Sequence, residues 1–209
     1  MKAFTKAEGV AIPLLENDIN TDQIAPVGGG VKLHEDYTET LFKNRRRRDD
    51  GSLDEGFVFN RPQFHRGSIL VTGHNFGCGS SRESAVWVFQ AIGVSCIIAR
   101  SFADIYRENC LQNGVLALAL PEADASRLES SVLSANGALA FSVDLNEKTI
   151  TGPDGLQIHF DISEAESTRL LEGLDDIGLT LKQRPEIEAW EKRMASEMPW
   201  AQHANASSL

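Results

Sequence analysis

The stretch SILVTGHNFGCGSSRESAVWVFQAIGVSCIIA, residues 68–99, decides the fold because it holds a strand, a glycine-rich loop, a helix and a second strand. Residues 68–71 are a short apolar run between two glycines, which predicts a buried strand. Residues 82–92 carry helix formers, and Gly93 supplies the glycine that commonly ends a helix. A second apolar run at 96–99 predicts the next strand. Buried strands joined through a helix by short links predict a parallel α/β sheet.

The same alternation continues on both sides of this unit. Residues 101–104 form a variant of the capping box, so the next helix is expected to open at Ser101 and to close at Gly114. Two strand-like runs, 138–145 and 156–162, are joined by turn residues and are expected to pair antiparallel. The other expected elements are a strand at 9–15 and helices at 122–133, 163–173 and 185–198. Together they predict an α/β fold with a mostly parallel sheet flanked by helices.

Length and composition predict one domain. The chain has 209 residues and 42% hydrophobic content, which suits a single core. We therefore expect a single domain over residues 1–200 and a disordered tail at 201–209. The first residues hold no apolar segment of the kind found in export signals, and no apolar run approaches the ~20 residues that cross a bilayer. The expected location is the cytoplasm, without contact to a membrane.

The charge balance argues against nucleic acid as a partner. The formal net charge is −10, whereas phosphate backbones are bound by clustered Lys and Arg. One basic run, residues 45–48, departs from this balance and is followed at once by two aspartates. It is either a solvated loop or a cationic rim that steers an anionic ligand.

The cysteines predict no metal site in this chain. Cys78, Cys96 and Cys110 are odd in number, widely spaced and set among apolar residues, which favours reduced packing thiols over a disulfide or a reactive thiol. The sequence contains no Cys-x-x-Cys and no His-x-x-x-His pair. Any metal in the reaction is therefore expected to come from a partner.

The glycine-rich loop at residues 77–81 predicts an anion site. Glycines allow main-chain N–H groups to approach a ligand, and the following helix directs its positive end to the same place. A phosphate loop would need a lysine after Gly79, and a dinucleotide loop would need a glycine at Arg82 and an acidic residue at Arg100. The remaining combination, two hydroxyls and a guanidinium, suits a carboxylate held by arginine.

Five motifs add a resemblance to a known family. They lie in the order 21–24 (TDQI), 75–83 (NFGCGSSRE), 101–105 (SFADI), 113–114 (NG) and 174–180 (LDDIGLT). This set resembles the small subunits of the 3-isopropylmalate dehydratases, the leucine-biosynthesis isomerases of the aconitase superfamily. The likeness runs from about residue 9 to residue 190.

The resemblance implies a fold, a partner and a reaction. The implied fold is the swivelling β/β/α domain of the aconitase C-terminal type. The implied partner is a large subunit that carries a [4Fe–4S] cluster, and the two chains form a heterodimer with a small hydroxy-dicarboxylate between them. The implied reaction is that of a hydro-lyase that interconverts 2-isopropylmalate and 3-isopropylmalate by dehydration and rehydration, active only with the large subunit.

The resemblance also implies roles for single residues. In the superfamily the first serine of the Gly-Ser-Ser-Arg run is the catalytic base, which corresponds to Ser80. The expected substrate-binding residues are Arg82, Ser81, Gly79, Asp22 and Lys32. Three simpler readings stay open: Ser80 or Ser81 caps the helix, and Asp22 is only a turn residue.

Two departures from the family leave the substrate open. Ser84 stands where most small subunits carry histidine, and residues 26–33 differ from the usual segment after the Thr-Asp-Gln-Ile run. The loop at 28–48 is where the family is thought to choose its substrate. A sister hydro-lyase of the citraconate, dimethylmalate or homoaconitate type is one alternative. A non-catalytic anion-binding module that works without an iron–sulfur partner is the other.

Overall fold

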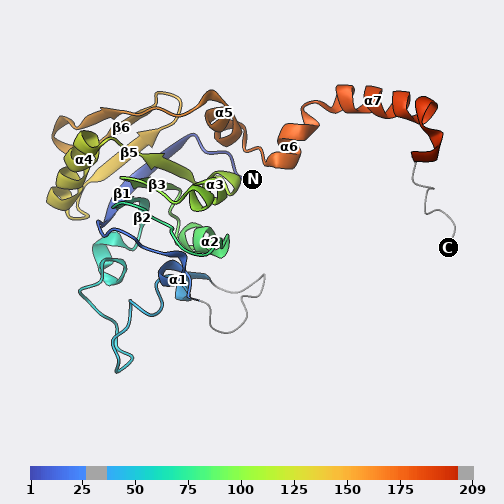
Figure 1. The fold of residues 1–209 in the computed structure, drawn as a ribbon. Coiled ribbons are helices and arrows are strands. Elements are labelled where there is room, and N and C mark those ends of the chain that lie inside the picture. The colour runs from blue at the N-terminus through green and yellow to red at the C-terminus, as the bar shows by residue number, and fades with distance from the viewer. Residues whose placement is uncertain (27–36, 202–209) are drawn as a thin grey trace. The chain divides into compact units, whose positions relative to one another are not determined.

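The computed structural model describes residues 1–26 and 37–201, which fall into two units, Met1–Gly173 and the part that begins at Leu174 (Figure 1). Lys32 and much of the 28–48 loop lie outside the described residues, as do residues 202–209 of the expected tail. A single domain that extends to residue 200 therefore stays a prediction. Within the described ranges, no helix has the length and apolar character that a membrane crossing requires.

The first unit is built on one mixed sheet, with the strand order β4-β3-β2-β1-β5-β6-β7. Strands β1 to β4 run parallel to their neighbours, whereas β1–β5, β5–β6 and β6–β7 pair antiparallel. The strands are β1 (Lys6–Leu14), β2 (Gly67–Thr72), β3 (Cys96–Ala99), β4 (Leu116–Ala119), β5 (Ala140–Asp144), β6 (Thr149–Thr151) and β7 (Gln157–His159). The parallel half of the sheet is the part that carries the predicted glycine loop.

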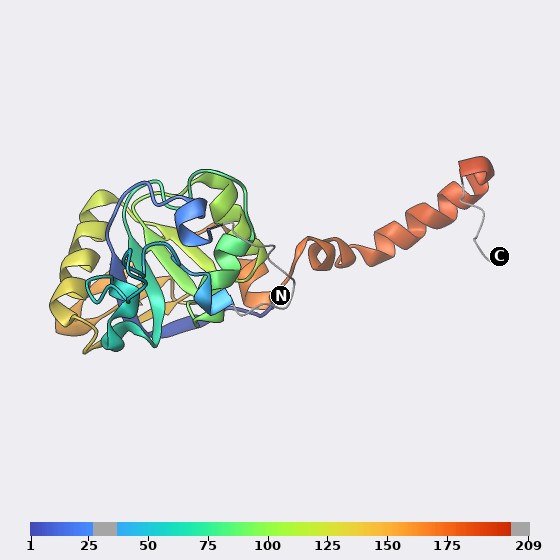
Figure 2. The ribbon, with the colours of Figure 1, turned by 90° about the horizontal axis from the view of Figure 1, so that it is seen from below.

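Helices cover both faces of this sheet (Figures 1 and 2). Those of the first unit are α1 (Thr21–Ile24), α2 (Ser84–Ala91), α3 (Asp104–Gln112), α4 (Glu122–Ala135) and α5 (Glu164–Glu172). Neighbouring strand residues belong to opposite cores: Leu70 and Ile97 pack with α2 and α3, whereas Ile69 and Ile98 pack with α4. A central strand buried on both faces needs an unbroken apolar run, which explains why these strands show no polar alternation.

Most of the predicted elements near the glycine loop are confirmed. Strands are found at 67–72 and 96–99, and a helix at 84–91 lies between them. The chain also carries short 3-10 turns at 37–39, 58–60 and 62–64, between β1 and β2. An α/β fold is thus present, with a parallel half and an antiparallel half of the sheet.

Two local predictions are wrong. The runs 138–145 and 156–162 do not pair with each other, because the three-residue strand β6 lies between β5 and β7. The second helix of the motif begins at Asp104 and not at Ser101. The Ser101 hydroxyl instead accepts a hydrogen bond of 2.8 Å from the main-chain N–H of Asn75, so it caps a loop of the neighbouring strand.

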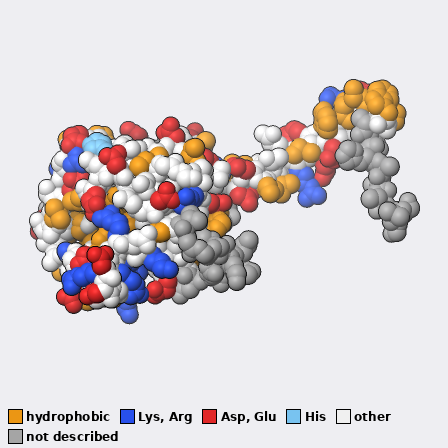
Figure 3. Space-filling model, turned by 60° about the horizontal axis from the view of Figure 1, so that its bottom comes forward, with side chains coloured by type: hydrophobic (Ala, Val, Ile, Leu, Met, Phe, Trp, Pro, Cys, Tyr) orange, Lys and Arg blue, Asp and Glu red, His pale blue; other side chains and the backbone are white. Residues whose placement is uncertain are grey.

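The second unit consists of α6 (Asp176–Leu181), α7 (Arg184–Glu197) and a short 3-10 turn at Pro199–Ala201. Asp175 caps α6, since its carboxylate accepts a 2.7 Å hydrogen bond from the N–H of Gly178. Helix α7 has no buried residue, as expected for a charged surface helix. Several large apolar side chains of this unit are exposed, among them Trp190 and Trp200 (Figure 3).

Candidate active site

A cavity of about 220 Å³ lies beside the glycine loop. Gly77 and residues 79–82 line the cavity from the loop, and residues 103–106 and Asn109 line it from α3 and the residue before it. Thr21 of α1 completes the lining. The cavity opens beyond the carboxyl ends of β2 and β3, which is where parallel α/β sheets bind ligands. Four of the predicted site residues, Gly79, Ser80, Ser81 and Arg82, share this cavity.

The shape of the loop depends on two glycines. Gly77 has φ +78° and Gly79 has φ +92°, a region that L residues rarely adopt. A Cβ on Gly77 would lie 2.1 Å from Cγ of Tyr106, a buried side chain under the loop. Glycine is therefore required at position 77 by both the backbone angle and the close approach of this ring.

The segment around α1 is joined to the loop by main-chain hydrogen bonds. The Gly77 N–H donates to the Ile19 carbonyl at 2.8 Å, and the Thr21 N–H donates to the Cys78 carbonyl at 2.9 Å. The buried Thr21 hydroxyl donates to the Ser80 carbonyl at 2.7 Å. Thr21 is thus a site residue that sequence reasoning missed, although it stands in the Thr-Asp-Gln-Ile motif.

Asp22 of this segment contacts the site directly. Asn20, and not Asp22, makes the capping turn, because the Asn20 side chain accepts from the Gln23 N–H at 2.8 Å. The Asp22 carboxylate forms an ion pair with Nη1 of Arg82. The simple turn reading of Asp22 is therefore wrong.

Arg82 lines the cavity with one charge partner among the described residues. Its side chain is 24% exposed, and its Nη1 is paired with the Asp22 carboxylate. A planar guanidinium carries five N–H donors, so this one ion pair leaves further donors for an anionic ligand in the cavity. Asp22 is 61% exposed and can turn outward.

The two serines do not cap the helix. Helix α2 begins at Ser84, and its N-cap residue is Glu83, which makes no side-chain hydrogen bond to the helix amides. Ser80 and Ser81 are both exposed in the cavity wall. Within the described part of the chain, neither hydroxyl donates to or accepts from another residue. The capping alternative is therefore wrong for both serines, and both residues line the cavity.

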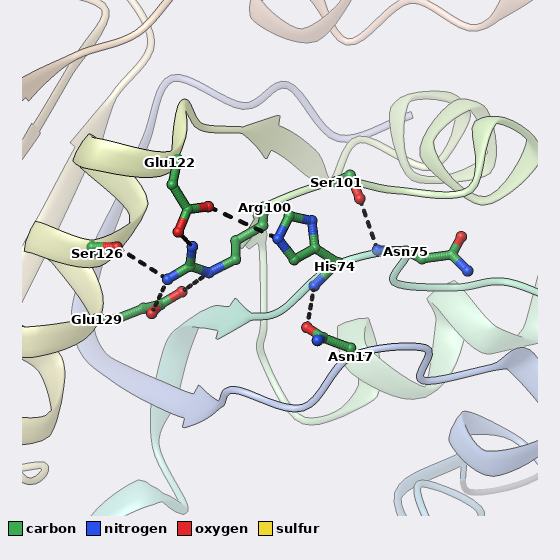
Figure 4. A network of polar contacts seen from close by, with 8 residues as sticks. All are labelled: Asn17, His74, Asn75, Arg100, Ser101, Glu122, Ser126 and Glu129. Atoms are coloured by element: carbon green, nitrogen blue, oxygen red, sulfur yellow. Dashed lines mark hydrogen bonds and ion pairs between the residues drawn. The ribbon is translucent and has the colours of Figure 1, made fainter.

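A second polar network lies behind the loop, at the end of β3 (Figure 4). The Arg100 guanidinium donates to both carboxylate oxygens of Glu129, at 2.8 and 2.7 Å, and forms an ion pair with Glu122. Hydrogen bonding to Arg100 lowers the pKa of the Glu122 carboxyl. Because two carboxylates already neutralise Arg100, this arginine joins α4 to the sheet and is not a ligand group.

Hydrogen bonds also join the segment before the glycine loop, residues 74–75, to residues 17–18 after β1. The His74 N–H donates to the Asn17 side chain at 2.8 Å (Figure 4). The Asn75 amide donates to the Asp18 carboxylate at 2.8 Å. Asp18 and Asn75 both have positive φ, 56° and 53°. Two residues in the left-handed region that bond to each other fix the two chain segments that enter the site.

The described residues offer no metal site. No group of three or more His, Cys, Asp or Glu side chains that could hold a metal ion occurs in residues 1–26 and 37–201. Cys96 and Cys110 are fully buried, and burial raises the pKa of both thiols. In the described residues the three thiols therefore form no ligand set for an iron–sulfur cluster.

The arginine run, residues 45–48, makes hydrogen bonds and ion pairs with neighbouring parts of the fold. Arg45 donates to both oxygens of Glu16, at 2.6 and 2.8 Å, and its guanidinium lies 5.0 Å from the centre of the Phe57 ring. Arg46 donates to Asn60 at 2.8 Å, and Arg48 lies 3.5 Å from Asp54. These contacts favour a structural role for the run over a free cationic rim.

Comparison with known proteins gives consistent results. The model of the aconitase C-terminal domain matches residues 1–123, and the model of the C-terminal domain of the 3-isopropylmalate dehydratase small subunit matches residues 176–204. The chain is 44% identical to a protein of Methylorubrum populi and 41% identical to one of Mesorhizobium japonicum, both named 3-isopropylmalate dehydratase small subunit. Each of these alignments covers 96% of this chain and 100% of the relative.

A solved structure supports the fold. The crystal structure of 3-isopropylmalate dehydratase (LeuD) from Methanocaldococcus jannaschii is similar, with a TM-score of 0.59 at 23% identity. The match covers 89% of this chain and 99% of that chain.

Proposed function

The chain belongs to the family of 3-isopropylmalate dehydratase small subunits, and from this premise we propose that it is one subunit of the hydro-lyase that interconverts 2-isopropylmalate and 3-isopropylmalate. The reaction is a step of leucine, and thus branched-chain amino acid, biosynthesis, and we place it in the cytoplasm. Identity above 40% over the whole length of relatives that carry this one name disfavours the sister hydro-lyases and the non-catalytic module.

The observation that carries the proposal is the position of Arg82 in the wall of the cavity. Its Nη1 is paired with the exposed Asp22 carboxylate, and the cavity beside it has room for a small ligand. A dicarboxylate can replace that carboxylate, since a planar guanidinium holds one carboxylate through two parallel hydrogen bonds. On this proposal the substrate carboxylate takes the position beside Arg82, and Asp22 turns toward solvent.

Ser80 has the role of base in this proposal. It stands two residues before Arg82 in the same wall of the cavity, so a carboxylate on Arg82 brings the neighbouring carbon toward the Ser80 hydroxyl. A serine hydroxyl needs positive potential to lose its proton, and Arg82 and the start of α2 provide it. The Gly77 N–H does not contribute, because it already donates to Ile19. Thr21 holds the Ser80 peptide by its carbonyl and so fixes the position of the base.

We further propose that a large subunit supplies the [4Fe–4S] cluster and that the active form is a heterodimer. The relatives are named small subunits, and the described residues of this chain offer neither a ligand cluster nor an accessible thiolate set. The purified chain alone is expected to be inactive, with activity restored by a cluster-bearing large subunit.

Steady-state kinetics of the reconstituted heterodimer test the proposal. Ser80→Ala is expected to lower kcat by about 10²–10⁴-fold, with an unchanged melting temperature because Ser80 caps no helix. Arg82→Lys keeps the charge and loses the two-pronged geometry, so it is expected mainly to raise KM. Ser81→Ala removes the neighbouring hydroxyl, which is expected to bind substrate and not to act as the base, so its effect is expected on KM and not on kcat. Near-normal turnover of Ser80→Ala would remove this residue from the mechanism. A preference of the wild type for citraconate over isopropylmalate would show that the proposed substrate is wrong.

A further inference from the structure

Asn113 links the end of α3 to one face of α2. Its side-chain oxygen accepts from Nε1 of Trp87 at 3.0 Å, and its amide nitrogen donates to the Glu83 carboxylate at 2.9 Å. Its main-chain carbonyl accepts from the Gln90 amide at 2.7 Å. Positions 83, 87 and 90 recur every three to four residues, so they lie on the same side of the helix. One asparagine therefore contacts α2 along its whole length.

Asn113 itself is held in a fixed orientation. Its side-chain nitrogen also donates to the Asn109 carbonyl at 2.9 Å, and its N–H donates to the carbonyls of Asn109 and Cys110, both at 3.1 Å. The next residue, Gly114, has φ +75°, and a Cβ there would lie 2.7 Å from the Lys2 carbonyl oxygen. The amide uses both its donor and its acceptor, and no other side chain of this size offers both in the same geometry.

The contact with Glu83 bears on the site because Glu83 follows Arg82 directly. Glu83 is the N-cap residue of α2, and it makes no side-chain hydrogen bond to the amides of the first turn. A first turn without a cap tends to fray. The hydrogen bond from Asn113 is a contact that α3 supplies to this uncapped end, and it restrains the backbone from which the Arg82 side chain extends.

We propose that Asn113 is a positioning residue for Arg82: by holding Glu83 and Trp87 it fixes the first turn of α2 and keeps the guanidinium directed at the substrate carboxylate. This inference rests on the proposed function, since it assigns a role in substrate binding at the same site. The inference also gives a role to the Asn-Gly motif at 113–114, neither residue of which lines the cavity.

The test replaces the amide by a carboxylate of the same shape. Asn113→Asp sets a carboxylate against the Glu83 carboxylate while still accepting from Trp87. The hydrogen bond to the Asn109 carbonyl within α3 is lost as well, so the Glu83→Gln rescue is what isolates the contact with α2. In the reconstituted heterodimer KM for 2-isopropylmalate is expected to rise on the order of tenfold, the usual size for loss of a hydrogen bond to a charged group, with kcat nearly unchanged. Adding Glu83→Gln is expected to restore KM, because the introduced amide donates to the aspartate. Glu83→Gln alone still accepts from Asn113 and is expected to resemble the wild type.

Hydrogen exchange of the isolated chain provides a readout that does not depend on turnover. Faster exchange in residues 83–87 is expected for Asn113→Asp and is expected to return to normal in the double variant. Asn136→Asp is the matched control, because it makes the same chemical change away from α2, at the residue that ends α4.

The possible outcomes separate this inference from the proposed function. An inactive wild-type heterodimer would count against the proposed function, whereas an active wild type with unchanged KM in Asn113→Asp would overturn the positioning role. A rise in KM that Glu83→Gln does not reverse would overturn the inference as well. So would a rise in KM accompanied by a clear fall in the melting temperature of Asn113→Asp, because both results would assign Asn113 a general structural role.

Discussion

Replacing Gly77 by alanine tests how closely the site loop depends on the ring beneath it. The added Cβ would lie 2.1, 2.4 and 2.5 Å from three atoms of Tyr106. Tyr106 cannot easily move, because it is buried, its hydroxyl donates to the Ala85 carbonyl at 3.2 Å and its ring packs edge-on against Phe76. Overpacking of this kind costs about 1–3 kcal/mol, and a non-glycine residue in the left-handed region costs about 1–2 kcal/mol more.

Gly93→Ala separates the two contributions. Gly93 has φ +89° and an added Cβ there meets no atom within 4 Å, so this control carries the backbone strain without the clash. Urea unfolding is expected to show a loss of about 1–2 kcal/mol for Gly93→Ala and about 2–5 kcal/mol for Gly77→Ala, with similar m-values. Activity of the heterodimer is expected to fall only for Gly77→Ala, because the shifted ring moves the loop. Equal midpoints for the two variants would show that Tyr106 yields freely and would refute the reasoning.

Two further predictions concern titratable groups. Hydrogen bonding to Arg107 lowers the pKa of the Glu166 carboxyl from 4.5, so this pair stabilises the fold above pH 4.5 and its contribution is lost as the pH falls below that value. Glu166→Gln is expected to flatten the loss of stability between about pH 5 and about pH 3 in urea titrations, and an unchanged slope would contradict this. Burial raises the pKa of Cys110 to about 12 and that of Cys96 as well, whereas Cys78 is partly exposed. Thiol labelling at pH 8 is expected to modify one cysteine in the folded chain and three after unfolding, and a second fast label would show that a buried thiol is reachable.

The fold near the glycine loop could be predicted because its signals are local. The apolar runs that form β2 and β3 have the length and flanking glycines of buried strands, and the structure confirms them. The strand β6 was missed because three residues between turns carry no recognisable pattern. The start of α3 was misplaced because Ser101 has the right spacing for a cap, but its hydroxyl is used by Asn75 instead.

The site could be predicted only where its residues are adjacent in the chain. Gly79, Ser80, Ser81 and Arg82 follow one another, so a single motif identified them. The contact between Thr21 and Ser80 joins residues 59 positions apart, and only the register of β1 against β2 brings them together. Lys32 lies outside the described residues, and its role stays a prediction.

The central position of β1 also governs when the site forms during folding. Because β1 pairs with β2 on one side and with β5 on the other, the first strand synthesised must wait for residues 67–72 and then 140–144. Closing such long loops costs entropy before any contact repays it, which slows the formation of sheets with distant partners. The Asp22–Arg82 pair is therefore expected to assemble only once β1 has docked against β2.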